Sequence, residues 1–312
     1  MKKKPRSPAW DYLEYISVRS FAALINSLPI AFSTWIARRV GDVFYSILPM
    51  RRKIALKNLD IAFENSITHA KKKHIAREAF QNLAASVMEF FRLPSLLKEA
   101  PERFEIEGTE HLDSALQKGK GVVFVVSHLG SWECLSFLFY LRSYSCTVVV
   151  RGTNNPYISK WIQTLRNQTR VHAIERAYAS KKILRCLKQN EMAAILIDQW
   201  AGSEGVWADF FGEKTSTTSI PARLVHRTGA ALIPGYCIRT GTGHFKIMIK
   251  PEVLTDKTDP EFEMKTTLKL NRQLENEIRR YTEQWTWTHR RWKGLERYTQ
   301  NKSAKQAGKG VG

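Results

Sequence analysis

The sequence has few cysteines, and those it has are far apart. The four are Cys134, Cys146, Cys186 and Cys237, and each lies in or beside an apolar run. This spacing excludes a dense disulfide framework and a cysteine-based metal cluster. We therefore expect four reduced cysteines buried in the core.

The sequence also lacks a long, clean hydrophobic run. The longest uncharged stretch, residues 20–37, is near the lower limit for a spanning helix and contains Asn26, Ser27 and Pro29. A single clean transmembrane span is therefore not expected. The amino terminus is basic and then apolar, but no small-x-small cleavage site follows a compact apolar core, so we expect no cleaved signal peptide.

Cations bracket the apolar and aromatic residues of the first part of the chain. They are Arg19, Arg38, Arg39, Arg51, Arg52 and Lys53. This pattern is typical of helices that lie in the headgroup region of a membrane, with their cations toward anionic lipid. The alternative is a helical hairpin buried in a soluble domain. We favour the membrane-associated interpretation and assign it to residues 1–50.

Acidic residues are scarce relative to basic ones. The chain of 312 residues has 49 Lys and Arg against 29 Asp and Glu, a formal net charge of +20. Such a charge predicts a negatively charged partner, for which nucleic acid, an anionic membrane surface and an acidic carrier protein all qualify. The cations are spread along the chain, and zinc-finger, RNA-recognition and helix-turn-helix signatures are missing, so we expect no nucleic-acid partner.

Hydrophobic spacing divides the remainder into helical and strand-like segments. Residues 50–100 have apolar positions three and four apart, which predicts amphipathic helices, and residues 261–285 predict one long helix. Short β-branched apolar runs follow Pro101. They occupy residues 121–127, 146–151, 171–175, 192–198, 231–238 and 244–250.

Helical stretches separate several of these runs, which predicts an α/β fold with a central, mostly parallel sheet flanked by helices. We assign residues 51–300 to this domain and expect a disordered tail at 301–312. In open sheets of this kind, ligands collect at the carboxyl ends of the strands.

One histidine and one glutamate follow the first of these runs, in "GVVFVVSHLGSWE". His128 comes directly after the predicted strand, Gly130 allows a turn, and Glu133 begins a segment with helical spacing. A glutamate in the first helical turn could accept a hydrogen bond from one imidazole nitrogen while the other nitrogen acts as a general base. The alternative is that His128 caps a strand end and Glu133 is a solvated acid, without chemistry.

Several ordered motifs resemble one enzyme family. They are "SHLGSWE", "VVVRGTNNPYISKWIQTLRN", "AAILIDQWAGSEGVWADFFGEKTSTTSIPARLVHRTGAALIPGY" and "EQWTWTHRRWK". Together they resemble the lipid A biosynthesis lauroyl/myristoyl acyltransferases, within the lysophospholipid acyltransferase-like superfamily. The resemblance covers roughly residues 15–295. One departure is Ser131, because this position of the motif is commonly asparagine.

The resemblance implies that His128 and Glu133 are catalytic, with His128 as the base that deprotonates an acceptor hydroxyl. It also implies that Arg151 holds a phosphate or the acyl carbonyl region, and that Asp198 lies beside the active-site cleft. The alternatives are a solvated strand terminus for Arg151 and a turn-capping acid for Asp198.

Three further residues receive roles from the resemblance. Phe210 and Phe211 would form a wall near the acyl chain, and Arg223 would contact a substrate phosphate. They could instead be ordinary core and a solvent-facing arginine. For the tryptophan cluster near residues 285–293, we favour closure of the core over an interfacial belt or a headgroup site.

The function implied is that of an O-acyltransferase on the cytoplasmic face of a bacterial inner membrane. It would move a fatty acyl group from acyl carrier protein, or from coenzyme A, to a hydroxyl of a lipid A precursor. The acceptor could also be another glycolipid or an aminolipid. The reaction would need no metal, no further cofactor and no covalent acyl-enzyme. A nucleic-acid-binding protein and a non-catalytic membrane-surface protein are the alternatives from other classes.

Overall fold

The computed structural model describes residues 7–150, 152–175, 179–295 and 298. The helices and 3₁₀ turns are α1 (Pro8–Ser27), α2 (Ile30–Ile47), α3 (Pro49–Phe63), α4 (His69–Phe91), α5 (Leu93–Lys98), α6 (Ala100–Arg103), α7 (Thr109–Gln117), η1 (Cys134–Ser136), α8 (Phe137–Leu141), α9 (Pro156–Asn167), α10 (Ala179–Lys188), η3 (Gly202–Glu204), α11 (Ile220–Thr228), α12 (Phe262–Arg280) and η4 (Thr282–Gln284). The strands are β1 (Phe104–Glu107), β2 (Val122–Val126), β3 (Cys146–Val150), β4 (Val171–Glu175), β5 (Met192–Leu196), β6 (Val206–Phe210), β7 (Glu213–Thr217), β8 (Ala231–Gly241) and β9 (His244–Ile249).

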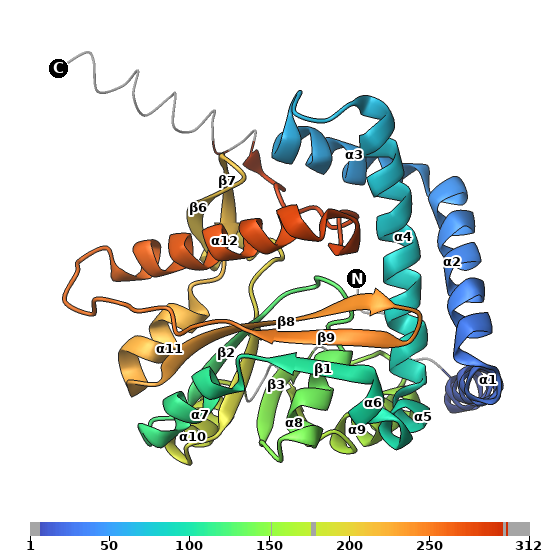
Figure 1. Ribbon diagram of the computed structural model, residues 1–312, viewed down its shortest axis with the longest axis horizontal. Helices are drawn as coiled ribbons and strands as arrows, with labels where there is room; N and C mark the ends of the chain where they lie inside the picture. Colours follow the sequence, from blue (N-terminus) through green and yellow to red (C-terminus); the bar gives the residue numbers. More distant parts are fainter. Residues whose placement is uncertain (1–6, 151, 176–178, 296–297, 299–312) are drawn as a thin grey trace.

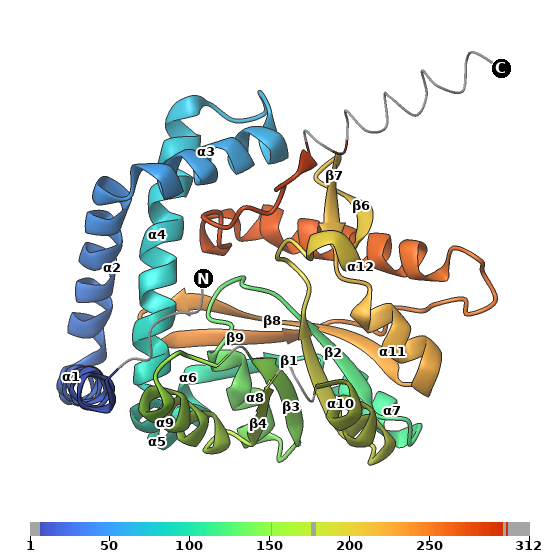
Figure 2. The same ribbon diagram turned by 180° about the vertical axis from the view of Figure 1, so that it is seen from behind.

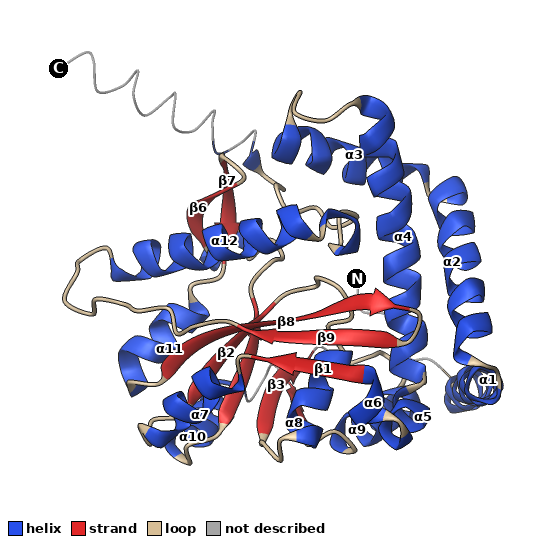
Figure 3. Cartoon of the chain, viewed as in Figure 1, coloured by secondary structure: helices blue, strands red, loops and turns tan. Residues whose placement is uncertain are grey.

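The strands form a seven-stranded sheet in the order β1-β9-β8-β2-β5-β3-β4. Figure 1 and Figure 3 show this sheet with helices around it. All neighbouring pairs are parallel except β8 and β9, which form an antiparallel hairpin. The predicted α/β fold with a mostly parallel sheet flanked by helices is confirmed. All six predicted strands are present as well.

The central strand β2 is buried on both faces, and its side chains divide the core in two. Val123 and Val125 pack into a cluster with residues of α10, α11 and α12. Val122, Phe124 and Val126 pack into a second cluster with residues of α7, α8 and α9. Alternating side chains of a strand point to opposite faces, so a continuous apolar run is what a strand covered on both sides requires.

Three strands were not predicted. β1 is short and carries alternating charged residues, so its sequence has no apolar run. β6 and β7 form a separate antiparallel pair in which Val206 lies opposite Thr217. β7 has the polar sequence EKTST, and β6, VWADF, has Asp209 among its apolar residues, so neither is a continuous apolar run. β6 is held against α12, where Asn271 donates to the carbonyl of Asp209 at 2.7 Å.

The helix expected after Glu133 is shorter than predicted. The chain forms the 3₁₀ turn η1 and then the single short helix α8. The long carboxyl-terminal helix ends at Arg280 instead of continuing to residue 285. Helix boundaries depend on contacts outside the segment, which periodicity does not contain.

The four cysteines are free and buried, as expected. The last predicted element, the tail at 301–312, lies outside the described residues, and so does Arg151.

The amino-terminal helices α1 and α2 lie at one side of the molecule, with α2 alongside α4 (Figure 1 and Figure 2). α2 and α4 pack closely: Gly41 of α2 has no side chain, and a Cβ there would collide with the backbone of Gln81 in α4. Asn155, the cap of α9, ties α1 to the α/β domain by donating hydrogen bonds to the Asp11 carbonyl (2.7 Å) and the Glu14 carboxylate (3.0 Å).

Large apolar side chains remain exposed on these two helices. They include Trp10, Leu13, Leu24, Trp35, Val43 and Ile47. Among the described residues, no helix is long and apolar enough to cross a membrane. The expected absence of a clean span therefore agrees with the described part of the chain, whereas association with a membrane surface stays a prediction.

Candidate active site

His128 and Asp198 meet at the carboxyl edge of the sheet. β2 and β5 are parallel neighbours, with Val126 opposite Leu196. His128 lies two residues after Val126, at the end of β2, and Asp198 lies two residues after Leu196, at the end of β5. The Nδ1 atom of His128 lies 2.9 Å from Oδ1 of Asp198, and the backbone amide of His128 donates to Oδ2 at 2.8 Å.

Asp198 is almost fully buried and receives a third hydrogen bond, from Nε1 of Trp285 at 3.0 Å. Burial alone would raise the pKa of this carboxyl, but His128 and these hydrogen bonds outweigh it and lower the pKa to about 2. Asp198 is therefore a carboxylate at neutral pH. It accepts the Nδ1 proton of His128, which leaves the lone pair on Nε2 available for a proton.

The ionisation of His128 is set by the same contacts. Burial disfavours the charged ring, yet the attraction of Asp198, its hydrogen bond and a smaller contribution from Glu133 raise the pKa above its ordinary value of 6.5. A histidine whose pKa is raised in this way can hold a proton taken from a substrate.

Glu133 does not make the hydrogen bond to His128 that the sequence pattern predicted. Its carboxylate instead forms a bidentate ion pair with Arg166 of α9, at 2.6 and 3.2 Å. The predicted hydrogen bond between Glu133 and His128 was therefore wrong. Arg166 holds the side chain of Glu133 toward α9, and Nδ1 of His128 is already paired with Asp198. Glu133 still acts on His128 through its charge.

The other side of the imidazole faces Gln199 and Trp132. Nε2 of His128 is 3.4 Å from Nε2 of Gln199, and the ring of Trp132 packs edge-on with its centroid 5.0 Å away. Gln199 also lines a mostly apolar cavity of about 610 Å³. The cavity extends along Val149, Ile183, Leu184, Ile195, Leu196, Ile220 and Leu224, with Arg223 and Arg227 among its lining residues.

The other predicted substrate residues have different positions. Arg223 lines the cavity. Phe210 and Phe211 are buried in the core against Trp285, Trp292 and Trp287, and the cavity wall is made by other residues. Asp198, predicted to lie beside the active-site cleft and grouped with the substrate-binding residues, is the hydrogen-bond partner of His128.

The tryptophan cluster closes the core, as favoured from the sequence. Trp285, Trp287 and Trp292 are all buried, and Trp285 and Trp287 pack edge-to-face at 4.6 Å. The cluster is also part of the site, because Trp285 fixes Asp198 and the adjacent Thr286 hydroxyl donates to the carbonyl of His128 at 3.0 Å.

Arg166, Trp285 and Gln199 were not identified as site residues from the sequence. Gln199 stands directly after Asp198 in "LIDQW", which is a local signal for its position. Arg166 lies on an amphipathic helix like any solvated cation, and nothing local distinguishes it. Within the described ranges, no group of three or more His, Cys, Asp and Glu side chains is arranged to hold a metal ion.

Comparison with known proteins places this chain in a class. Over 273 residues the chain is 28% identical to a lipid A biosynthesis palmitoleoyltransferase of Escherichia coli K12, covering 85% of this chain and 86% of that protein. It is 25% identical over 280 residues to the lipid A biosynthesis lauroyltransferase of the same organism, covering 86% and 88%. A phosphatidylinositol mannoside acyltransferase of Mycobacterium tuberculosis is 28% identical over 163 residues, about half of each chain.

These relatives are all lipid acyltransferases, and the chain is an acyltransferase enzyme acting on lipids. The profile described as "Bacterial lipid A biosynthesis acyltransferase" matches residues 2–294. The chain therefore belongs to the bacterial lipid A biosynthesis acyltransferase family.

Proposed function

We propose that the protein transfers a fatty acyl chain from a thioester, on acyl carrier protein or coenzyme A, to a hydroxyl of a lipid A precursor. The observation that carries the proposal is the His128–Asp198 pair, whose outward Nε2 lies beside Gln199 at the wall of an apolar cavity. A base next to an apolar cavity suits a reaction between a hydroxyl and a fatty acyl thioester.

In this mechanism Nε2 of His128 removes the proton of the acceptor hydroxyl. The oxygen attacks the thioester carbonyl and a tetrahedral intermediate forms. The carbon–sulfur bond then breaks, and the thiolate takes the proton from the imidazolium. Asp198 keeps the ring in the required tautomer and stabilises its charged form, because it accepts the Nδ1 proton throughout.

Glu133 and Arg166 act beside this pair. Glu133 favours the imidazolium through its charge, and Arg166 holds Glu133 in place. The cavity lined by Ile183, Leu196 and Leu224 receives the acyl chain of the donor. Each methylene buried there contributes about 0.8 kcal/mol to binding, which lets the site select a long chain. The thioester is a co-substrate, and the proposal needs no other cofactor.

The amino-terminal helices bring the enzyme to its lipid acceptor. Trp10, Leu24 and Trp35 are exposed on α1 and α2, and cations flank them along the chain. A helix pair with exposed aromatic and aliphatic residues beside cations suits the interface of an anionic membrane. We place the enzyme at the cytoplasmic face of the bacterial inner membrane, where the positive charge also suits an acidic carrier protein.

The test uses the purified full chain in mixed lipid micelles, with acyl carrier protein and coenzyme A thioesters of several chain lengths. The acceptors are a lipid A precursor and, as an alternative glycolipid, a phosphatidylinositol mannoside. Mass spectrometry should detect one added acyl chain on the lipid A precursor. The variant His128→Ala should lose the activity, whereas His172→Ala, at an exposed histidine of β4, should keep it.

Two results would contradict the proposal. Wild-type protein that acylates neither acceptor from any thioester is the first, and full activity in His128→Ala is the second. Acylation of the mannoside alone would replace the proposed acceptor while leaving the chemistry of His128 in place.

A further inference from the structure

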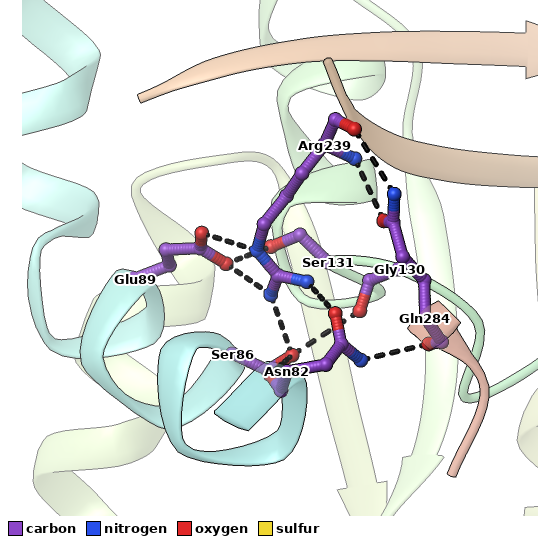
Figure 4. Close-up of polar contacts among 7 residues, drawn as sticks. All are labelled: Asn82, Ser86, Glu89, Gly130, Ser131, Arg239 and Gln284. Carbon is purple, nitrogen blue, oxygen red and sulfur yellow. Dashed lines mark hydrogen bonds and ion pairs between the residues drawn. The ribbon is translucent and has the colours of Figure 1, made fainter. Parts of the chain in front are cut away.

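A second polar cluster holds the loop that carries His128, and it contains neither Asp198 nor Glu133 (Figure 4). We name it the Arg239 network. Its members come from α4, from β8, from η4 and from the loop itself. They are Asn82, Ser86, Glu89, Gly130, Ser131, Arg239 and Gln284.

The centre of the network is a largely buried ion pair between Glu89 and Arg239. The guanidinium of Arg239 donates to both carboxylate oxygens of Glu89, at 2.6 and 2.5 Å. It also donates to the Ser86 hydroxyl at 2.7 Å and to the side-chain oxygen of Asn82. Burial opposes the charge, but Glu89 raises the pKa of Arg239, so the guanidinium stays charged.

The network reaches the loop through both a side chain and the backbone. The Ser131 hydroxyl donates to Oε2 of Glu89 at 2.6 Å, and the Ser86 hydroxyl lies 3.1 Å from the Gly130 carbonyl. The Gly130 amide donates to the carbonyl of Gln284 at 2.9 Å, and the same carbonyl accepts from Asn82 at 2.7 Å. Gln284 is in turn fixed to the backbone of Arg239 by two hydrogen bonds of 3.0 Å.

The loop itself is under tight steric constraint. Gly130 has a φ of +67°, and a Cβ at this position would collide with the carbonyl oxygen of Cys237. The Ser131 amide donates to that same carbonyl at 2.8 Å. Ser131 is fully buried, so its hydroxyl must find its partner inside the protein, and it finds Glu89.

A buried ion pair of this kind contributes little to the free energy of unfolding. Taking two charges out of water costs several kcal/mol, and well-packed apolar residues often stabilise a fold as well or better. What the pair supplies is a fixed carboxylate for one loop: Arg239, 150 residues further along the chain, holds Glu89, and Glu89 accepts the hydrogen bond of Ser131. That loop carries the proposed base.

We propose that Ser131 and Glu89 are positioning residues for the acyl transfer. Arg239 holds Glu89, and Glu89 fixes Ser131. The loop so fixed keeps Nδ1 of His128 on Asp198 and Nε2 toward Gln199, which lines the cavity. The inference rests on the proposed function for its effect on rate. Its effect on the imidazole does not need the reaction at all, and the experiment separates the two.

The experiment compares Ser131→Ala with the matched variant Ser136→Ala in the full-length protein. Ser136 is also buried and lies in η1, but its hydroxyl has no hydrogen-bond partner among the residues that the structure describes. Ser131→Ala should lower kcat about 10-fold with KM for both substrates changed less than about 2-fold, because a misplaced base slows chemistry without weakening binding. Ser136→Ala should have wild-type kcat, and the Tm of both variants should fall by no more than about 4 °C.

A second measurement observes His128 directly, by ¹⁵N NMR of protein labelled on histidine, with the signal assigned from His128→Ala. Wild type and Ser136→Ala should show neutral His128 protonated on Nδ1. Ser131→Ala should show a mixture of the two tautomers, and Glu89→Gln a larger share of the second. The proposal is overturned if the tautomer and kcat of Ser131→Ala match the wild type, or if both serine variants lose kcat equally.

A wild-type protein that transfers no acyl group would defeat the proposed function. The tautomer measurement would then still decide whether the Arg239 network positions His128.

Discussion

The loop between β2 and η1 has an ionisable side chain near each end, and the two ends are built differently. At the first end, His128 faces a buried carboxylate whose three hydrogen bonds all come from N–H groups. At the second end, Glu133 faces the permanent cation of Arg166 and is more exposed. Each end has one carboxylate, but only the first pairs it with a group that can gain and lose a proton near neutral pH.

The spacing of His128 and Glu133 had suggested that one carboxylate both contacts the imidazole and favours its charged form. The structure divides these two roles between Asp198 and Glu133. A carboxylate that fixes a tautomer must touch the imidazole, and Asp198 does so. A carboxylate neutralised by an arginine acts on the imidazole only through its residual field, and Glu133 is of this kind. Variants at the first end should therefore have the larger effects.

The largest effect is expected from Asp198→Asn. Oδ2 of Asp198 accepts two N–H groups, so the asparagine oxygen must take that place and its NH₂ must face Nδ1. His128 would then be protonated on Nε2 and could not act as a base. We expect kcat to fall about 10³- to 10⁴-fold, measured by product formation under saturating substrate. The control Asp113→Asn, at an exposed aspartate, should have the wild-type kcat. A similar kcat for both variants would contradict the role of Asp198 as the residue that fixes the tautomer of His128.

A smaller loss is expected at the second end. Glu133→Gln and Arg166→Gln should each lower kcat about 10- to 100-fold, because each removes one charge from a preorganised pair. Since the two residues act as a unit, the double variant should lose little more than the worse single variant. Fully multiplicative losses would mean that Glu133 and Arg166 act separately on the substrates.

The pH dependence should distinguish the two members of the second pair. The base must be neutral, so kcat/KM should fall as the pH decreases through the raised pKa of His128, above 6.5. Glu133→Gln removes an attraction for the imidazolium and should move this limb to lower pH. Arg166→Gln leaves Glu133 unpaired and should move it to higher pH. Shifts in the same direction would show that the charge of Glu133 does not reach His128.

The smallest effect is expected at Gln199. Its amide nitrogen is 3.4 Å from Nε2 of His128, and the side chain is exposed, so the contact is weak. Gln199→Ala should change kcat less than about 3-fold. A loss greater than about 10-fold in steady-state assays would mean that Gln199, and not Asp198 alone, orients the base.

Many of the strands and helices could be predicted, because the patterns that specify them lie within a few neighbouring residues. The buried strands are continuous apolar runs such as "GVVFVV", and the helices between them have their own periodicity. β6 and β7 could not be predicted, because neither is a continuous apolar run like those of the buried strands. The position of His128 just beyond a strand end was predicted correctly, and its catalytic role stays a prediction.

The hydrogen-bond partner of His128 could not be predicted from local sequence. The residue five positions away was available to pattern recognition, whereas the actual contact is with a residue 70 positions away. Both strands are predicted by the sequence, although β5 ends at Leu196 and not at residue 198, but their side-by-side arrangement depends on which strands pair. Phe210 and Phe211 illustrate the same limit, because their aromatic character does not show whether they face a cavity or the tryptophan core.

The sequence by itself determined the layered α/β architecture, the strand end that carries His128 and the motifs that resemble the acyltransferase family. It could do so because periodicity and turn chemistry act over a few residues. Only the tertiary structure decided that Asp198 and not Glu133 touches His128, that Arg166 neutralises Glu133, and that Glu89 and Arg239 hold Ser131. These contacts join separate elements of the chain. The pairing of β2 with β5 brings His128 to Asp198, and the packing of α9 and α4 beside the loop brings Arg166 and Glu89 to theirs, neither of which local residues encode.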